Sequence, residues 1–254
     1  MTRADVGVFG GSGFYSFLDD VDTVDVETPY GAPSGPVTIG SVGDRRVAFL
    51  PRHGRRHELP PHRINYRANV WAMRELGVRA IVAPCAAGSL QAHIHPGELV
   101  VVDQLVDRTS GRADTFFDGP EVHHVSFAEP YDAGLRAVLV AAAAELGLVA
   151  HDGGTMVVVQ GPRFSTRAES RWFGSMGWEV INMTGYPEAV LAAELAIPYA
   201  AVALITDYDA GLAGVDGISV DGIEPVTEEM VFSFFEGNIE RVRTLLFAAI
   251  PLLP

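Results

Sequence analysis

Short apolar runs recur along the chain, separated by loops rich in glycine, proline and polar residues. Such runs between breaker residues are typical of buried strands. Longer stretches between them either place apolar residues on one helical face or are rich in alanine, which is typical of helices packed on a sheet. The alternation predicts an α/β fold. The expected strands cover residues 6–9, 47–50, 80–83, 97–106, 154–160, 179–183 and 199–206.

End signals place the helices of this pattern. Gly77 follows the first helix as a stop, and Asp132 is a cap for the second. Thr166 and Glu169 have the spacing of a capping box, so we interpret Glu169 as a cap before a ligand residue. The last helix is amphipathic and is expected to be interrupted near Gly237. The expected helices cover residues 63–76, 132–146, 166–175 and about 227–248.

The stretch 179–209 brings polar side chains to the ends of two strands. We expect Pro187 and Glu188 to open the helix between these strands, because proline is tolerated in a first turn and an acid favours the positive end of the dipole. Ligands in α/β sheets collect beyond the carboxyl ends of strands. One site should therefore receive an amide and a hydroxyl from the first strand end and carboxylates from the second: Asn182, Thr184, Asp207 and Asp209.

The charge of the chain limits its partners. The 254 residues carry a formal net charge of −14 with a pI of about 4.9, which argues against nucleic acid or an anionic membrane as a partner. A small anion in a local basic pocket is still compatible with such a surface. The single cysteine leaves no disulfide framework and favours a reducing cytoplasm. A strand that begins at residue 6 leaves no room for a signal peptide.

Two segments are candidates for binding an anion. Residues 10–13, Gly-Gly-Ser-Gly, follow a strand and can present amides together with the Ser12 hydroxyl; a bare turn is equally compatible. A dinucleotide fingerprint would need a glycine where Ser16 stands. Residues 51–57, PRHGRRH, concentrate basic side chains at another strand end, where a solvated charge run is the alternative to an anion site. His53 and His57 have no Glu or Cys set that completes a metal site.

The remaining loops leave their roles open. Cys85 follows a strand, and a lone cysteine is most often a small buried apolar residue. Phe164 follows another strand and is either part of the core or a surface on which a planar ligand stacks. Residues 210–222 form a loop with four glycines and no periodicity, which is typical of a lid.

Taken together in chain order, six motifs resemble the purine nucleoside phosphorylase superfamily, and specifically the 5′-methylthioadenosine phosphorylases. They are GGSGF, PRHGRRH, CAAGSL, GPRFSTRAES, NMTGYPE and TDYD. The resemblance runs from Val8 to about Pro251. It implies a single α/β domain over residues 1–254, with a central mixed and partly barrel-like sheet flanked by helices, and a cytoplasmic homotrimer.

The same resemblance implies a reaction and a set of site residues. The reaction is cleavage of a nucleoside by phosphate, in purine and methionine salvage, with phosphate as co-substrate and no other cofactor or metal. The implied phosphate ligands are Ser12, Arg52, His53, Cys85, Ala86 and Thr184. Phe164, Met183, Asn182 and Tyr208 would contact the nucleoside, with His124 from a neighbouring subunit near the 5′ substituent. Asp207 and Asp209 would read the base, and Asp207, with its pKa raised by burial, would protonate it at N7.

Substrate preference follows from a few positions. Phosphorylases for 6-oxopurines resemble one another in carrying Glu and Asn where this chain has Ser165 and Asp207, so adenine is favoured. Val220 and Met183 suit a methylthio group, and ordinary loop packing is the alternative interpretation of Val220. Cys85 in place of threonine, Gly185 with Tyr186 after NMT, and the end of the chain at Pro254 depart from the usual pattern. The leading expectation is a methylthioadenosine phosphorylase that also accepts adenosine. The alternatives are a phosphorylase for methylthioinosine or other 6-oxopurine nucleosides, and a non-catalytic nucleoside-binding protein. A nicotinamide-dependent oxidoreductase is disfavoured by Ser16.

Overall fold

In the part of the chain that the structure describes, the fold is built on one mixed sheet of eleven strands. The computed structural model describes residues 4–10, 18, 21–211 and 226–253. The strands are β1 (Val6–Gly10), β2 (Asp22–Val24), β3 (Val37–Val42), β4 (Arg45–Pro51), β5 (Ala80–Ser89), β6 (Leu99–Val101), β7 (Gln104–Arg108), β8 (Ala150–Asp152), β9 (Thr155–Val159), β10 (Val180–Asn182) and β11 (Tyr199–Asp207).

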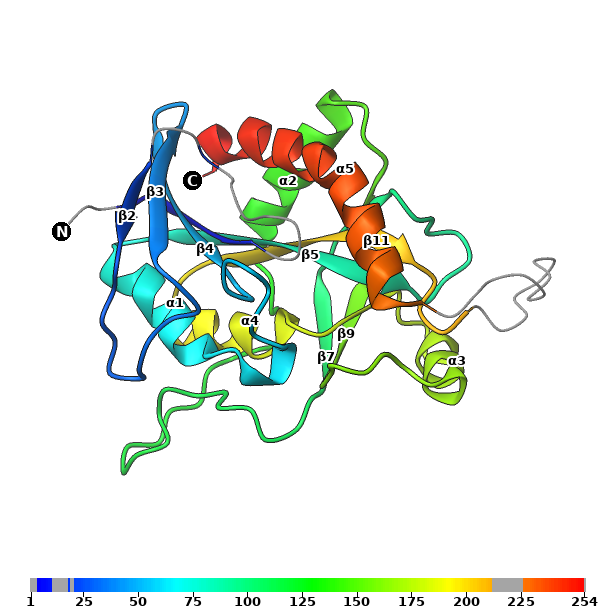
Figure 1. Cartoon of the computed structure of the whole chain (residues 1–254), viewed down its shortest axis with the longest axis horizontal. Helices are drawn as coiled ribbons and strands as arrows, with labels where there is room; N and C mark the ends of the chain where they lie inside the picture. Colours follow the sequence, from blue (N-terminus) through cyan, green and yellow to red (C-terminus); the bar gives the residue numbers. More distant parts are fainter. Residues whose placement is uncertain (1–3, 11–17, 19–20, 212–225, 254) are drawn as a thin grey trace.

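Strand β5 is the branch point of the sheet. The main path runs β2-β3-β4-β1-β5-β10-β9-β7, while β11 pairs with β5 and with β6, and β6 pairs with β8. β5 is parallel to β1 and β11 but antiparallel to β10, which joins it only at Gly88 and Ser89. The sheet therefore changes direction at the carboxyl end of β5, and β7 and β9 run steeply across β5 in Figure 1.

Helices cover both faces of the sheet (Figure 1). On one side lie α1 (Tyr66–Glu75) and α4 (Gly185–Glu194), and on the other α2 (Ala133–Glu145) and α5 (Glu228–Ala249). Each pair packs on its own cluster of buried apolar side chains. α3 (Arg167–Ser175) lies at the end where β5, β9 and β11 finish, and 3-10 turns span Pro61–Arg63 and Ile250–Leu252.

The local end signals of the helices are largely confirmed. Thr166 and Glu169 form the expected capping box, and the side chain of Asp132 accepts from the amide of Leu135. The first helix begins later than expected, after Asn65, because Pro60 and Pro61 set up a separate 3-10 turn. None of the helices in the described ranges combines the length and apolar character needed to cross a membrane.

Three expectations about elements are wrong. Cys85 does not follow a strand but lies within β5, which continues to Ser89. The strand expected over residues 97–106 is divided into β6 and β7, because pairing passes from β11 and β8 to β9 between Val101 and Gln104. The expected interruption near Gly237 does not occur, and α5 continues through it. A glycine in an exposed helical position lowers helix stability by only about 1 kcal/mol, which packing of the opposite face offsets.

Candidate active site

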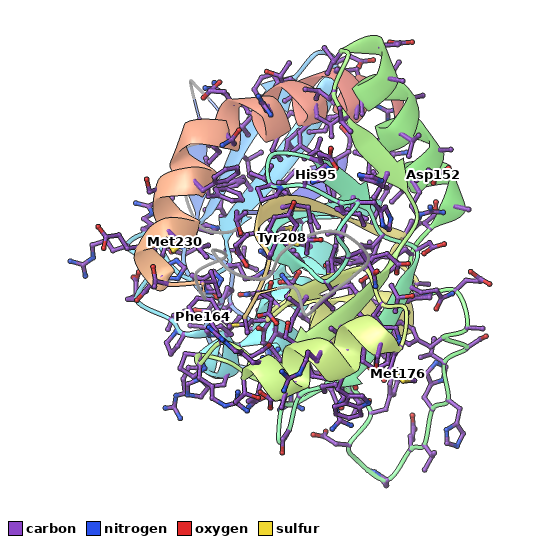
Figure 2. The ribbon with its side chains drawn as sticks, turned by 90° about the vertical axis from the view of Figure 1, so that its right-hand side faces the viewer. His95, Asp152, Phe164, Met176, Tyr208 and Met230 are labelled. Carbon is purple, nitrogen blue, oxygen red and sulfur yellow. The ribbon has the colours of Figure 1, made fainter. Side chains whose placement is uncertain are left out.

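A pocket opens beyond the carboxyl ends of the central strands, with a cavity volume of about 310 Å³. Figure 2 faces this end of the molecule, with Met230 marking the first turn of α5 and Phe164 the loop after β9. Most of the residues expected from sequence line the pocket together. They are Arg52, His53, Cys85, Ala86, Phe164, Ser165, Asn182, Met183, Thr184, Asp207 and Asp209.

Arg52 is the largest fully buried side chain at the pocket, and its partner is Glu188. Its Nε and Nη2 donate to the two oxygens of Glu188, the second bond at 2.9 Å. The Tyr199 hydroxyl also donates to Glu188, at 2.9 Å. Burial alone would lower the pKa of Arg52, but the Glu188 carboxylate raises it above its usual value. Glu188 lies in the first turn of α4, as expected from the sequence, and it is also the buried counter-ion of Arg52.

The pairing changes how this corner of the pocket can bind an anion. Arg52 and Glu188 together carry no net charge, so attraction must come from directed hydrogen bonds rather than from excess positive charge. Arg55 and Arg56 are exposed and do not line the pocket, so the basic cluster of residues 51–57 divides into buried and solvated parts. His57 stays with the buried part, stacked on His53 with ring centroids 4.2 Å apart.

Asn182 organises the strand end next to Arg52. Its Oδ1 accepts from the amides of Thr184 (2.6 Å) and Gly185 (2.7 Å), and its Nδ2 donates to the carbonyl of Ala86 (3.2 Å). Because these atoms are engaged internally, Asn182 holds the turn in shape more than it offers polar groups to a ligand. The Thr184 hydroxyl accepts from Asn182 Nδ2 (3.3 Å), which leaves its hydrogen available to an anion.

Two of the departures from the family pattern have a structural basis. A Cβ at Gly185 would lie 2.9 Å from the Met156 sulfur, so a larger residue needs Met156 to move. Cys85 is buried, and burial raises the pKa of its thiol to about 12. The thiol is therefore neutral at physiological pH and offers only a weak donor where threonine would offer a hydroxyl.

The two aspartates lie at an irregularity in β11. Its register against β5 shifts between Ile205 and Asp207, and such bulges re-aim side chains near active sites. Asp207 Oδ2 accepts from the Thr206 hydroxyl (2.6 Å) and Oδ1 from the Asp209 amide (2.7 Å). Burial and the charge of Asp209 nevertheless raise the pKa of Asp207. A Cβ at Gly88 would lie 2.8 Å from Asp207 Oδ1, so glycine is what lets this carboxyl group approach β5.

Asp209 is more deeply buried than its neighbour. Burial raises its pKa, although the hydroxyls of Ser170 and Ser165 lie near enough to favour the charged form. Within the described part of the chain, however, neither Asp209 Oδ2 nor the Ser165 hydroxyl has a hydrogen-bond partner of good geometry. A buried polar atom without a partner is costly, so these two atoms are set up to receive groups of a ligand.

Arg112 supports the nucleoside side of the pocket and was not found by sequence reasoning. It donates to the carbonyls of Tyr186, Met183 (2.9 Å) and Gln160 (2.9 Å), tying the ends of β9 and β10 together. Arg112 lies in the long polar segment between β7 and α2, where no local sequence pattern sets it apart from the exposed arginines elsewhere in the chain.

The structure separates other expected residues from the pocket. Tyr208 does not line it; its hydroxyl hydrogen-bonds His95 Nδ1 (2.8 Å), as Figure 2 lets the reader follow. His124 is exposed on the segment between β7 and α2, which projects from the body in Figure 1. Ser12 and Val220 lie outside the described residues. His57, from the basic cluster of residues 51–57, also lines the pocket. Sequence reasoning missed three further lining residues on α5: Glu228, Val231 and Phe232.

Comparisons with known proteins identify the family and agree with the fold. Residues 5–250 match the family model of the phosphorylase superfamily. The S-methyl-5′-thioadenosine phosphorylase of Mycolicibacterium smegmatis is 58% identical over 96% of this chain and 90% of its own length. The purine nucleoside phosphorylase of Streptomyces coelicolor is 52% identical over 99% of this chain and 90% of its own length. The structure of methylthioadenosine phosphorylase from Schistosoma mansoni in complex with adenine superposes with a TM-score of 0.90, at 37% identity over 98% of this chain and 92% of that one.

Proposed function

The chain belongs to the phosphorylase superfamily, and from this premise we propose that it is a pentosyltransferase that cleaves 5′-methylthioadenosine with inorganic phosphate. The products are adenine and 5-methylthioribose 1-phosphate. One observation carries the proposal: a single pocket joins a corner of hydrogen-bond donors, Arg52 and Thr184, to a pair of buried aspartates with raised pKa values. Apart from phosphate, which is a co-substrate, this chemistry needs no cofactor.

The two corners match the charges that develop during the reaction. Cleavage of the glycosidic bond leaves positive charge on the ribose and negative charge on the departing purine. A phosphate dianion beneath the sugar stabilises the first charge. An aspartic acid with a raised pKa donates a proton or a hydrogen bond at N7 and stabilises the second. We assign this role to Asp207, with Asp209 and Ser165 as partners for the rest of the purine edge.

A 6-amino purine fits these acceptors better than a 6-oxo purine, because a carboxylate accepts from an amino group whereas an oxo group needs a donor. The competing substrate class is 6-oxopurine nucleosides, which the name of the Streptomyces coelicolor relative leaves open. Asp207→Asn should move the ratio of kcat/KM values from adenine toward hypoxanthine nucleosides. An unchanged ratio would mean that Asp207 does not read position 6.

The remaining wall of the pocket faces the 5′ end of such a nucleoside. Val231 and Phe232 are apolar and suit a methylthio group, while His57 and Glu228 add polar groups at the same wall. Adenosine should therefore be accepted as a second substrate. A Schistosoma mansoni relative, which is described as an adenosine/methylthioadenosine phosphorylase, has a variant solved with methylthioadenosine at a TM-score of 0.89.

We also propose a cytoplasmic homotrimer that acts in purine and methionine salvage, with residues 1–254 forming one catalytic domain. The free Cys85 suits a reducing compartment. Trp172 on α3 and Met176 directly after it are 46% and 56% exposed, and Val122 near His124 is 76% exposed. Exposed apolar side chains of this size support burial of these surfaces by another copy. Light scattering at several protein concentrations measures the mass, and a monomer at all of them would contradict the trimer.

The reaction is tested by incubating the protein with methylthioadenosine, with and without phosphate, and measuring free adenine. We expect release that depends on phosphate. Equal release without phosphate would identify a hydrolase, and no release with tight nucleoside binding would identify a non-catalytic binding protein. Methylthioinosine, adenosine and inosine assayed in parallel separate the 6-amino from the 6-oxo preference.

A further inference from the structure

His53 is held in one tautomer by the backbone of its own loop. Its Nδ1 lies 2.9 Å from the carbonyl oxygen of Leu59, and the amide of Leu59 donates back to the carbonyl of His53 at 3.0 Å. A carbonyl oxygen only accepts, so Nδ1 carries the hydrogen. The other ring nitrogen, Nε2, then carries a lone pair, and the ring lines the pocket beside Arg52 and Thr184.

The surroundings of His53 keep this ring neutral. It is 7% exposed, and burial lowers its pKa to about 3, helped by the charges of His57 and Arg52. Within the described residues, the hydrogen bond to Leu59 is the only one that the ring makes. The other titratable groups around it are the neutral thiol of Cys85, Glu188 engaged by Arg52, Glu58 and Glu228 acting on His57, and Asp207 and Asp209 elsewhere in the pocket.

Among the described residues, the anion corner therefore combines donors with one acceptor. Arg52 and the Thr184 hydroxyl donate, while His53 Nε2 accepts. A fully deprotonated tetrahedral dianion brings no hydrogen for that acceptor, so its oxygen would face a lone pair. Hydrogen phosphate has the same shape and charge and carries one hydroxyl, which removes the conflict.

We propose that His53 accepts a hydrogen bond from the hydroxyl of HPO₄²⁻ and thereby selects a protonated tetrahedral dianion over an unprotonated one such as sulfate. The proposal rests on the assignment of this corner as the phosphate site. It makes His53 a specificity-determining residue for the co-substrate, and it fixes which phosphate oxygen faces the histidine and which remain free for the sugar. Sulfate can bind only when the protein supplies the missing proton, by protonation of His53.

Proton linkage tests this directly. The wild-type protein is titrated calorimetrically with sulfate, phosphate and arsenate at pH 8, in two buffers with different ionisation enthalpies, so that the difference in heat reports the protons taken up. We expect about one proton taken up per sulfate and about none per phosphate or arsenate. Sulfate affinity should also fall about tenfold from pH 7 to pH 8, whereas the affinity for HPO₄²⁻ stays level.

Variants separate this role from a structural one. In His53→Asn the amide can donate to an oxyanion, so sulfate should bind without proton uptake and the preference for phosphate should collapse by about tenfold or more. The matched control is His62→Gln, an exposed histidine outside the pocket, which should keep the wild-type linkage. If His53→Asn does not fold, the wild-type comparison of the three anions decides alone.

Each other result overturns the proposal. The proposal is wrong if sulfate binds the wild type without proton uptake, or if phosphate binding takes up as many protons as sulfate binding. It is also wrong if neither anion binds. The linkage is separable from the proposed reaction. Normal linkage without nucleoside cleavage would reject the phosphorylase, and phosphate-dependent cleavage without the linkage would reject only the role of His53.

Discussion

At the scale of single residues, the site depends on a missing side chain as much as on those present. Gly88 lies on β5 opposite Asp207 in the register of the two strands. The close approach of Asp207 Oδ1 and of the Asp209 backbone leaves no room there for a Cβ. The position of the purine-binding acid is therefore set by a residue with no chemistry of its own.

Gly88→Ala should displace the Asp207 carboxyl group without changing any catalytic side chain. Because misplacement of a reacting group by about 1 Å can lower rates by about a hundredfold, we expect kcat/KM for the nucleoside to fall by about that factor. Steady-state kinetics measures it. Gly237→Ala is the matched control, since a Cβ there meets nothing within 4 Å and should leave kinetics unchanged while raising stability by about 0.5–1 kcal/mol. Equal kinetics in both variants would contradict the role of Gly88.

At the scale of elements, α4 is attached to β4 by a buried ion pair. Glu188 on α4 is 0% exposed and Arg52 beyond β4 is 1% exposed. Removing one partner of a buried pair leaves an uncompensated charge and costs about 3–5 kcal/mol. The pair thus connects α4, which begins directly after Thr184, to the loop that contains His53.

Glu188→Gln should therefore lower the free energy of unfolding by about 3–5 kcal/mol in chemical denaturation. Glu240→Gln is the control, because Glu240 is 74% exposed and its 3.7 Å pair with Arg243 is worth less than about 1 kcal/mol. A loss in Glu188→Gln no larger than in the control would mean that Arg52 finds another counter-ion.

The same pair shows what sequence reasoning reaches and what it does not. The caps at Asp132 and Thr166 were predictable because cap and helix are neighbours in the chain. Arg52 and Glu188 are 136 residues apart, so the pattern around Arg52 offered no acid to pair with it. Most pocket residues were expected from motifs at strand ends, whereas Arg112 was missed because its carbonyl partners come from distant strands.

At the scale of the whole molecule, burial of the active-site acid Asp207 lowers the stability of the fold as pH rises. The folded state raises the pKa of Asp207 above its ordinary value, mainly through burial. A carboxyl group with a raised folded pKa contributes stability below the unfolded value, and this contribution is lost as pH rises through the folded value. Wherever the pH exceeds the folded value, the buried charge of Asp207 therefore lowers the stability of the fold.

Asp207→Asn should be more stable than the wild type at pH 7.5, and the gain should shrink as pH falls toward 4. Thermal unfolding across this range measures it. Asp5→Asn should change stability in the opposite direction, because the Arg46 amide lowers the pKa of Asp5 in the folded state. Its loss of stability should be present at neutral pH and disappear in acid. A constant difference between Asp207→Asn and wild type at every pH would rule out a shifted pKa.

The branch point at β5 has a consequence for the size of the substrate. Ala86 at the anion corner and Gly88 beside the purine-reading acid lie two residues apart on this one strand. A strand advances about 3.3 Å per residue, so the two corners are separated along β5 by about 7 Å. Because three neighbouring strands hold β5 in place, this spacing is rigid. The fixed distance between the two corners therefore limits the length of the substrate. One pentose fits between the phosphate nucleophile and the base, and a longer spacer does not.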